Sequence, residues 1–307
     1  MTKRVLVTGS TGFVGQQVIE PLIKLGYEVH GVSRKKNATS ILGLVEHNYD
    51  ILMPGAIDAM LDKVCPTHLL HLAWTPDPGR SLMSFDNIQW ASVTLNLFHA
   101  FKIRNGIRAV FVGSCAEYDW NYSILNEYTT PLTPETLYGT SKNSVREIIE
   151  FASYDTKFSC AWARLFFLYG PHERESRFVA SVARALAIGV PIATTDGSHQ
   201  RDYMHVEDAG LALALLLNSE IVGPINIAAG YCCPMSNILN ILGEISGSPS
   251  LIEIGGVESQ NYTAPVLAAD VTRMREELRF IPNYSLESGL TLTYEWWFKK
   301  MKSGKFK

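Results

Sequence analysis

A glycine-rich turn between a strand and a helix constrains the fold of this chain more than any other feature. The β-branched and aliphatic run at residues 5–8 predicts a strand, and the apolar spacing over residues 18–22 predicts a helix. Between them stand Gly9, Gly12 and Gly15. There the first glycine permits a sharp turn, the second lets backbone approach a ligand, and the third lets the helix pack on the sheet. This order predicts an α/β fold with a doubly wound parallel sheet of the Rossmann type.

The start of that helix predicts a binding site for a pyrophosphate. Unpaired backbone amides and the positive end of the helix dipole attract phosphate groups at such a place. We therefore expect a dinucleotide cofactor, the alternative being an ordinary strand–helix turn without a ligand. The residues expected around the pyrophosphate are Gly9, Thr11, Gly12, Phe13 and Val14.

A basic sequence ends the second predicted strand, at residues 28–33. A carboxylate at this place accepts hydrogen bonds from the ribose hydroxyls of NAD, whereas a cation accommodates the 2′-phosphate of NADP. The strand ends in Ser33 and Arg34, followed by Lys35 and Lys36, with no carboxylate. Because arginine can grip a phosphate with two parallel hydrogen bonds, NADP(H) is favoured over NAD(H). The alternative is a solvated basic loop without a ligand.

The segment after this strand is expected to pass near the adenine. Residues 40–45 are compatible with a short helix, and Asp50 and Ile51 follow a brief extended stretch. These two residues are candidates for contact with the adenine, although an aspartate in a loop after a strand is often only a turn former.

A continuous apolar run at residues 68–74 predicts a buried parallel strand. Ligands of open α/β sheets lie beyond the carboxyl ends of the strands, so Leu72, Ala73 and Trp74 are expected beside the cofactor. We interpret His71, inside the same run, as a packed core histidine and not as a catalyst.

A tyrosine and a lysine one helical turn apart are the clearest sign of chemistry. Tyr138 and Lys142 lie on one face of a predicted helix. A neighbouring ammonium lowers the pKa of a phenol from its usual value of about 10, so the tyrosine can exchange a proton with a carbonyl or alcohol oxygen. Ser114 ends another predicted strand, at residues 107–113. The Tyr138–Lys142 pattern becomes specific only in combination with the glycine turn and with Ser114.

Several motifs follow one another in a characteristic order. They are the glycines 9, 12 and 15, Ser114 four residues before Tyr118, Tyr138-x-x-x-Lys142, Arg164 through Tyr169-Gly170-Pro171, and Arg201-Asp202-Tyr203-x-His205-Val206-x-Asp208. Together they resemble the extended short-chain dehydrogenase/reductase family, which acts on nucleotide-linked sugars. The resemblance implies that the serine orients the substrate oxygen, the tyrosine transfers the proton, and the lysine holds the nicotinamide ribose and lowers the tyrosine's pKa.

Departures from the family pattern narrow the expected reaction. Family dehydratases carry an acid pair directly after the serine, where this chain has Cys115 and Ala116, and Glu117 is one residue out of register. Dehydration is therefore not expected. Phe167 and Trp90 replace two family asparagines, which indicates a more apolar substrate pocket.

The resemblance also implies a set of substrate contacts. Arg201 corresponds to an arginine that binds the substrate's diphosphate, although a salt bridge to Asp202 or Glu207 is an alternative role. Arg273 resembles a second arginine that contacts the nucleotide. The full set of expected substrate residues is Cys115, Phe167, Arg177, Phe178, Arg201 and Arg273.

The leading hypothesis is an NADPH-dependent reductase for the keto group of a nucleotide-linked 4-keto-6-deoxy sugar. The region 194–208 and the missing acid pair resemble reductases of bacterial surface-polysaccharide pathways, such as CDP-abequose synthase. An NAD(P)-dependent nucleotide-sugar 4-epimerase using the same three residues is the alternative. A non-catalytic dinucleotide-binding protein is less favoured, because such proteins typically lose the tyrosine or the lysine.

Length and composition set the remaining expectations. The 307 residues allow a Rossmann domain over 1–170, with 205–230 returning to it, and a smaller C-terminal α/β substrate-binding region over 171–307. A net charge of −3 gives no reason to expect nucleic acid or an anionic membrane as partner. No signal peptide or membrane-spanning run is found in the sequence, so a cytoplasmic protein is expected.

Five cysteines without CxxC spacing make a disulfide framework or a metal site improbable. We interpret them as reduced thiols, mostly small core residues. The helices expected around 85–105 and 138–154 correspond to those that pair subunits in the family, so the resemblance implies a homodimer.

Overall fold

Among the residues that the computed structural model describes (3–34, 41–74, 82–258 and 264–303), a seven-stranded parallel sheet is the central element. The strands lie in the order β3-β2-β1-β4-β5-β7-β11, and each pairs with its neighbours in parallel. Their bounds are β1 Arg4–Thr8, β2 Glu28–Ser33, β3 Leu44–Asn48, β4 His68–His71, β5 Arg108–Ser114, β7 Ser159–Leu165 and β11 Gly223–Ile227. The expected Rossmann-type fold is confirmed.

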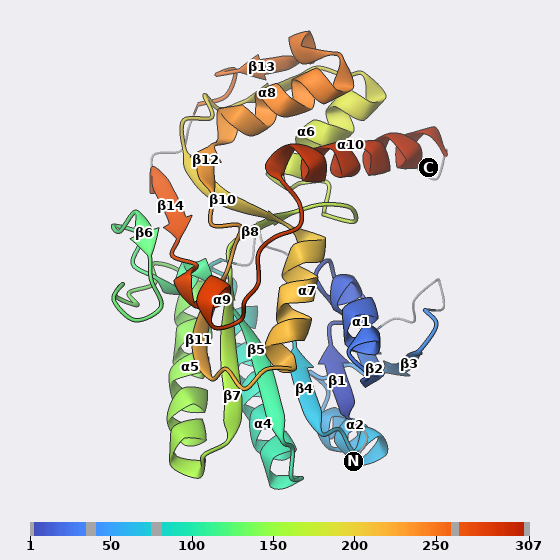
Figure 1. Ribbon diagram of the computed structural model, residues 1–307, viewed down its shortest axis with the longest axis vertical. Coiled ribbons are helices and arrows are strands. Elements are labelled where there is room, and N and C mark those ends of the chain that lie inside the picture. Colours follow the sequence, from blue (N-terminus) through green and yellow to red (C-terminus); the bar gives the residue numbers. More distant parts are fainter. Residues whose placement is uncertain (1–2, 35–40, 75–81, 259–263, 304–307) are drawn as a thin grey trace.

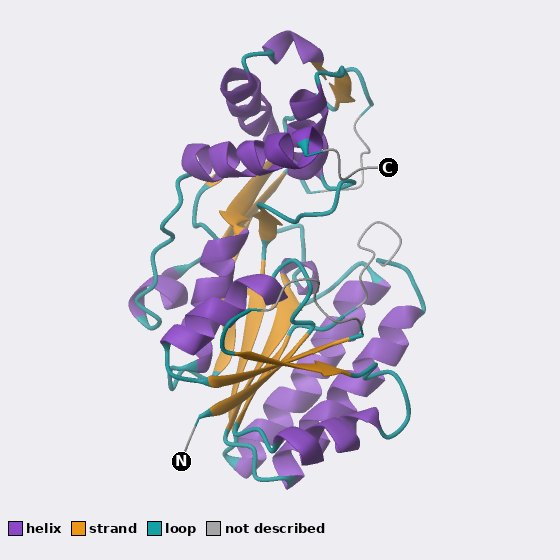
Figure 2. Ribbon diagram, turned by 90° about the vertical axis from the view of Figure 1, so that its right-hand side faces the viewer, coloured by secondary structure: helices purple, strands orange, loops and turns teal. Residues whose placement is uncertain are grey.

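Helices cover both faces of this sheet (Figures 1 and 2). On one face α1 (Gly15–Lys24) packs against α7 (Val206–Leu217), and their apolar side chains share a core with β1, β7 and β11. On the other face lie α2 (Ala56–Val64), α4 (Asp86–Ile103) and α5 (Leu137–Thr156), with a second apolar core beneath them. Burial on both sides explains the nearly continuous apolar runs of the inner strands.

The predicted glycine turn joins β1 to α1. Gly9 has a φ of +72°, a left-handed conformation that favours glycine. A Cβ atom on Gly15 would overlap the carbonyl oxygen of Gly9, so glycine at 15 lets the first turn of α1 close onto the turn itself. Glycine at 15 therefore serves packing on the turn, whereas the sequence predicted packing of the helix on the sheet.

The edge of the sheet differs from expectation. The short helix predicted over residues 40–45 is wrong for the described residues, because residues 44–48 form β3 (residue 40 lies outside them). Leu44 to Asn48 pair in register with Val29 to Ser33 of β2. Pairing with a neighbouring strand satisfies the backbone groups of this segment, and this tertiary effect outweighs a weak local helical pattern.

A second layer stands above the carboxyl ends of the strands (Figure 1). Its core lies between α6 (Phe178–Ile188), α8 (Met235–Ser246) and α10 (Leu286–Lys302), and it buries Trp297 completely. Its short strands are β6 Ile124–Leu125, β8 Phe167–Tyr169, β9 Ile192–Thr194, β10 Gln200–His205, β12 Cys232–Pro234, β13 Ile252–Ile254 and β14 Val266–Ala269. The single-turn helices are η1 (Cys115–Glu117), η2 (Pro249–Leu251) and α9 (Thr272–Glu276).

The chain passes between the two layers more than once. After β8 it builds α6 and β9 in the second layer, and it returns through β10 and α7 to add β11 beside β7. Residues 206–227 therefore complete the large sheet. None of the helices described is long and apolar enough to cross a membrane.

Candidate functional site

The ends of three strands meet the glycine turn. The amide of Gly9 donates to Val32 O at the end of β2 (2.9 Å), and the amide of Leu72, just after β4, donates to Thr8 O (3.2 Å). A Cβ atom on Gly9 would lie 3.0 Å from the amide nitrogen of Ala73. The structure thus brings together the expected cofactor residues Gly9, Thr11, Gly12, Phe13, Val14, Ser33, Arg34, Leu72, Ala73 and Trp74.

This edge fits a dinucleotide. Val14, the N-cap of α1, makes no side-chain capping hydrogen bond, and the amides of Gln16 and Gln17 donate to Gly12 O (3.1 Å) and Val14 O (3.0 Å). The positive end of the helix dipole lies at this turn, where it favours an anion. A Cβ atom at Gly12 would lie only 3.1 Å from Gly9 O, so the turn has little room for a larger residue. Arg34 is exposed directly after β2, in a place suited to a phosphate on the adenosine ribose, whereas Lys35 and Lys36 lie outside the described residues.

Asp50 makes the local contact of a turn former. Its Oδ1 accepts a hydrogen bond from the amide of Leu52 (3.1 Å), and its carbonyl accepts one from Met53 (3.0 Å). Ile51 is 6% exposed and belongs to the core under α2 and α4. Both residues stabilise the loop after β3, and their contact with an adenine stays a prediction.

Ser114 and Tyr138 lie together at the end of β5. Ser114 caps η1, and its Oγ accepts from the amide of Ala116 (3.2 Å). Tyr138 stands in the first turn of α5, whose N-cap Thr136 accepts from Gly139 N (3.1 Å), and the phenol is hydrogen-bonded to Ser114. A Cβ atom on Gly139 would overlap Ala116 O, so this glycine lets α5 approach η1 closely enough for the contact.

Lys142 completes the set from the next turn of α5. Its side chain is 4% exposed, and its Nζ donates to Val112 O (2.7 Å) and lies 3.8 Å from the centre of a ring of Trp74. Burial lowers the pKa of Lys142 to about 7 and raises that of Tyr138 to about 12. The groups that lower the phenol's pKa are Ser114, by its hydrogen bond, and Arg177, by its charge. In the chain alone the buried ammonium of Lys142 is itself destabilised and bonds to a carbonyl, and its lowering of the phenol's pKa stays a prediction.

His71 is a core residue, as expected. It is 2% exposed, with Nδ1 2.7 Å from Thr8 Oγ1 and Nε2 2.9 Å from Thr94 Oγ1. Because the Thr94 hydroxyl donates to Trp90 O (2.8 Å), Nε2 carries the hydrogen and Nδ1 accepts from Thr8. Burial lowers the pKa of His71 to about 3, so the imidazole is neutral and fully hydrogen-bonded.

Glu117 is completely buried, and its carboxylate faces Arg164. It forms an ion pair with Arg164 and bonds to the amide of Ser114. Cys115 is also buried, which raises its thiol pKa to about 12, and Ala116 has no proton to exchange. The chain therefore presents no acid directly after the serine.

Aromatic rings surround Arg201 in the second layer. The guanidinium lies 5.5 Å from the ring of Phe167, and Tyr203 contacts the rings of Phe167 (5.6 Å) and Phe178 (6.4 Å). Arg177 is exposed, and its charge acts on both Tyr138 and Tyr203. The expected substrate residues Phe167, Arg177, Phe178 and Arg201 thus share one region facing the end of β5.

Arg201 is buried without an acidic partner among the described residues. It is 5% exposed and donates to the carbonyls of Gln200 (2.7 Å) and Pro265 (3.4 Å). The carboxylate of Asp202 is turned to the amides of Ala229 (2.8 Å) and Gly230 (3.0 Å) instead. The structure therefore does not contain the alternative salt bridge of Arg201 with Asp202 or Glu207.

The structure corrects the expectation that Arg273 contacts the nucleotide. Its guanidinium forms a two-pronged ion pair with Glu277 (2.6 Å for each contact) and also donates to the carbonyls of Pro224 and Val222 at the start of β11. In a parallel sheet, all strands start at the end of the sheet opposite to the glycine turn, which follows the carboxyl end of β1. The hydrogen-bond donors of Arg273 are therefore used within the chain, away from the glycine turn.

Two features of the site were not predicted. Tyr203 lies within the Arg201 motif, but its ring contacts depend on the pairing of β8 with β10, which local sequence does not specify. Trp162 lies on β7, where its indole bonds to Glu117. Glu117, an acidic residue three positions after Ser114, was the available signal for the second feature. Among the residues described, no group of three or more His, Cys, Asp or Glu side chains could hold a metal ion.

Comparison with known proteins now assigns the family. Residues 5–228 match the model of the NAD dependent epimerase/dehydratase family. The chain belongs to this family and is an enzyme. Within the family, GDP-mannose 3,5-epimerase 1 of Oryza sativa subsp. indica is 22% identical over 320 residues, covering 95% of this chain and 81% of that protein.

Solved structures support the family fold. The UDP-glucose 4-epimerase of Thermotoga maritima with UDP-glucose matches with a TM-score of 0.87 at 22% identity, covering 97% of this chain and 99% of that one. The dTDP-glucose 4,6-dehydratase of Bacillus anthracis with NAD matches with a TM-score of 0.83 at 20% identity, covering 98% of each chain. The epimerase/dehydratase architecture thus extends over nearly the whole chain.

Proposed function

We propose that this enzyme interconverts a carbonyl and a carbinol on the sugar of a nucleotide-diphosphate sugar, with Tyr138 as the group that moves the proton. The observation that carries the proposal is the meeting of Ser114, Tyr138 and Lys142 at the strand edge that holds the glycine turn. A bound nicotinamide dinucleotide supplies or accepts the hydride there.

The protonation states suit reduction of a carbonyl. Because burial raises its pKa, Tyr138 holds its proton at neutral pH and can donate it to a developing alkoxide. The Ser114 hydroxyl, bonded to Tyr138, would bind the same oxygen. Lys142 stands one turn away, where its ammonium would contact the nicotinamide ribose.

The buried charge of Arg201 supports a diphosphate as the substrate's anionic group. Arginine stays charged at all accessible pH values and binds phosphate through two parallel hydrogen bonds. The rings of Phe167, Phe178 and Tyr203 nearby would pack against the nucleobase or sugar. The solved structures named above are a UDP-glucose 4-epimerase with UDP-glucose and a dTDP-glucose 4,6-dehydratase, which agrees with this class of ligand.

Net reduction of a 4-keto-6-deoxy sugar with NADPH is the first candidate reaction. Exposed Arg34 after β2 supports it, since no carboxylate of that strand end competes for the ribose hydroxyls. The second candidate is a 4-epimerase that retains NAD, supported by the likeness to the UDP-glucose 4-epimerase of Thermotoga maritima and to the dehydratase of Bacillus anthracis with NAD. Dehydration is the least supported, because Glu117 is buried in an ion pair.

Two assays separate these candidates. The purified enzyme is incubated with dTDP-4-keto-6-deoxyglucose and either NADPH or NADH, and loss of the reduced nicotinamide absorbance in proportion to product indicates net reduction. In parallel, UDP-glucose is incubated with NAD, and NMR detection of UDP-galactose without net change of the cofactor indicates epimerisation.

Tyr138→Phe is the decisive variant in whichever assay shows turnover. We expect its rate to fall by about 10²- to 10⁴-fold, because proton transfer contributes that much. Tyr154→Phe, on the exposed far end of α5, is the matched control and should keep the wild-type rate. A Tyr138→Phe enzyme with unchanged turnover would remove the phenol from the mechanism.

The proposal includes a homodimer formed through α4 and α5. These helices pack side by side, and they expose large apolar side chains, including Phe151 (77%) and Tyr154 (86%) on α5 and Ile88 (53%) on α4. Large apolar side chains exposed on helices can mark protein–protein interfaces. Light scattering after size-exclusion chromatography should give twice the chain mass for the wild type and a lower mass for Phe151→Glu.

A further inference from the structure

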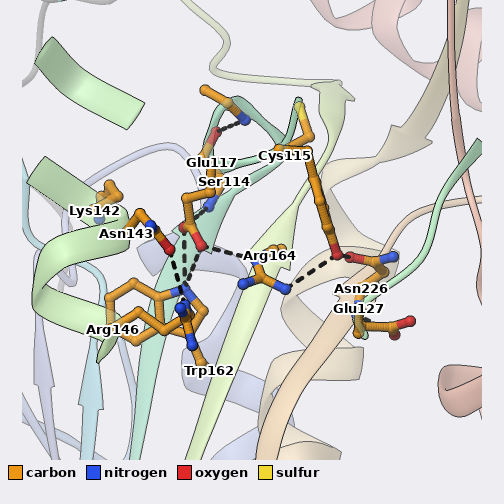
Figure 3. Close-up of polar contacts among 12 residues, drawn as sticks. Ser114, Cys115, Glu117, Glu127, Lys142, Asn143, Arg146, Trp162, Arg164 and Asn226 are labelled. Atoms are coloured by element: carbon orange, nitrogen blue, oxygen red, sulfur yellow. Dashed lines mark hydrogen bonds and ion pairs between the residues drawn. The ribbon is translucent and has the colours of Figure 1, made fainter. Parts of the chain in front are cut away.

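An oppositely charged pair is buried directly behind Ser114. Glu117 and Arg164 are both 0% exposed, and Arg164 Nε lies 2.7 Å from Glu117 Oε2. The indole nitrogen of Trp162 donates to both oxygens of Glu117 at 3.0 Å (Figure 3). Two buried charges are costly unless close pairing and additional hydrogen bonds offset their desolvation. Here the pairing is close, and Trp162 and Tyr118 add hydrogen bonds, while Arg164 Nη2 has no hydrogen-bond partner among the described residues.

The carboxylate of Glu117 holds the backbone of Ser114. Its Oε1 accepts a hydrogen bond from the Ser114 amide at 2.8 Å, while Ser114 Oγ accepts from the amide of Ala116 at 3.2 Å. These two bonds close a capping box around η1. The Ser114 hydroxyl is also hydrogen-bonded to the phenol of Tyr138.

The segment that carries Ser114 has no room to shift. A Cβ atom on Gly113 would overlap both Trp162 Nε1 and Glu117 Oε1, and one on Gly139 would overlap Ala116 O. The turn is thus enclosed between the charged pair below and the first turn of α5 above. Any displacement of Glu117 must therefore change the distance between Ser114 and Tyr138.

The same carboxylate acts electrostatically on the other two members of the set. Its negative charge raises the pKa of Lys142 and of Tyr138, so it favours the ammonium and the neutral phenol. His71, which faces Lys142 from β4, is neutral. Tyr138 is also faced by the neutral thiol of Cys115 and by the charge of Arg177. Among the groups facing either residue in the described structure, Glu117 is the carboxylate common to both.

We propose that Glu117, held by Arg164 and Trp162, is a positioning residue that fixes Ser114 against Tyr138 and keeps a negative charge behind Lys142. This inference rests on the proposed function of those three residues. It assigns to Glu117 a role in catalysis without contact with substrate or cofactor.

The first test measures turnover of Glu117→Gln and of the double variant Glu117→Gln/Arg164→Met. The double variant removes both charges, leaves no unpaired buried charge, and is therefore the form expected to fold well. We expect kcat to fall about a hundredfold with little change in KM, since misplacing reacting groups by about 1 Å can cost that much. The substrate is whichever sugar nucleotide the wild type turns over.

The matched control is Tyr118→Phe. The Tyr118 hydroxyl accepts from Arg164 Nη1 (3.1 Å) and donates to Asn226 (2.7 Å), so the variant disturbs the same buried network without touching Ser114 or Glu117. It should lower the melting temperature and leave kcat unchanged.

The second test needs no substrate. In protein labelled with ¹³C at the lysine Cε, one resonance should titrate near pH 7 and be absent from Lys142→Met. In Glu117→Gln and in the double variant its midpoint should move to lower pH by about half a unit or more, roughly a threefold change in the ratio of ammonium to amine. Tyr118→Phe should keep the wild-type midpoint.

A folded double variant with wild-type kcat and a wild-type Lys142 midpoint would overturn the proposal and leave Glu117 as a core ion pair only. If the wild type turns over none of the sugar nucleotides, the proposed function fails, and the Lys142 titration alone decides the role of Glu117. A lowered midpoint then supports it, and an unchanged midpoint contradicts it.

Discussion

Two buried arginines on either side of the Ser114 turn differ in how their charge is balanced. Arg164, in the sheet, lies 2.7 Å from the carboxylate of Glu117 and bonds to Tyr118. Arg201, in the second layer, is nearly as buried but donates only to two carbonyls within the described structure. A buried cation that the chain neutralises serves the fold, whereas one that it leaves unneutralised favours an anion from outside.

Lys142 is a third buried cation and follows another route. It too has a carbonyl partner and no bonded carboxylate, but an amine can release its proton where a guanidinium cannot. Burial accordingly lowers its pKa to about 7. The charge of Arg164 is paired within the chain, that of Arg201 is left for the proposed ligand, and Lys142 can release its proton near pH 7.

The largest effect on stability is expected from replacing Arg164, the cation that is paired with Glu117. Arg164→Met should lower the free energy of unfolding by about 3–5 kcal/mol, because it leaves Glu117 buried without its cation. Urea denaturation measures this loss. A variant as stable as the wild type would show that the pair is not needed to balance the charge of Glu117.

Replacing the cation that can lose its proton should affect stability in a pH-dependent way. The folded pKa of Lys142 is below the unfolded value of 10.5, so the unfolded chain binds more protons between pH 7 and 10.5. The folding penalty of Lys142 is complete below pH 7 and declines as pH rises, by about 1.4 kcal/mol per pH unit. Lys142→Met should therefore be more stable than the wild type at pH 7, with a gap that narrows toward pH 9.

Urea denaturation of both proteins at several pH values gives that gap directly. Comparing the two proteins cancels the contributions of other titrating groups. A gap that stays constant with pH would mean that Lys142 keeps its proton in the folded enzyme.

Arg201→Met should weaken ligand binding without lowering stability, the opposite of what is expected for Arg164→Met. We expect unchanged or increased stability, since the chain loses a buried charge that it does not pair. Binding of UDP should weaken about ten- to a hundredfold, the usual contribution of a charged hydrogen bond. Calorimetric titration with UDP, and with CDP, GDP and dTDP to identify the base, measures this. A loss of stability as large as that of Arg164→Met would make Arg201 a structural residue.

The smallest effect is expected at the exposed cation. Arg34→Ala should weaken NADPH by about 1 kcal/mol, or a few-fold, because exposed ion pairs contribute little. NADH binding should hardly change. Fluorescence titration with both dinucleotides compares them, and equal losses would argue against a phosphate contact.

Sequence reasoning succeeded where function depends on local order along the chain. The strand–glycine–helix order predicted the β1–α1 turn, and one-turn spacing predicted that Tyr138 and Lys142 share a face of α5. Ser114 could be placed because it ends a strand. These residues need few distant contacts to be where they are.

It failed where the position depends on pairing between distant segments. Residues 44–48 become a strand because β2 lies beside them, and Arg273 is taken up by Glu277 and the start of β11. The buried setting of Glu117 likewise requires Trp162 and Arg164 from β7. No local pattern encodes such partners.

The return of the chain from the second layer to β11 has a consequence during synthesis. Until residues 223–227 leave the ribosome, β7 is the open edge of the sheet, with unpaired backbone groups along one side. Asn226, which receives the hydroxyl of Tyr118, is also absent until then. A nascent chain that stops before this point would expose an unpaired edge strand and lack part of its buried polar network. Such a chain is prone to aggregation, and we expect chaperones to bind it.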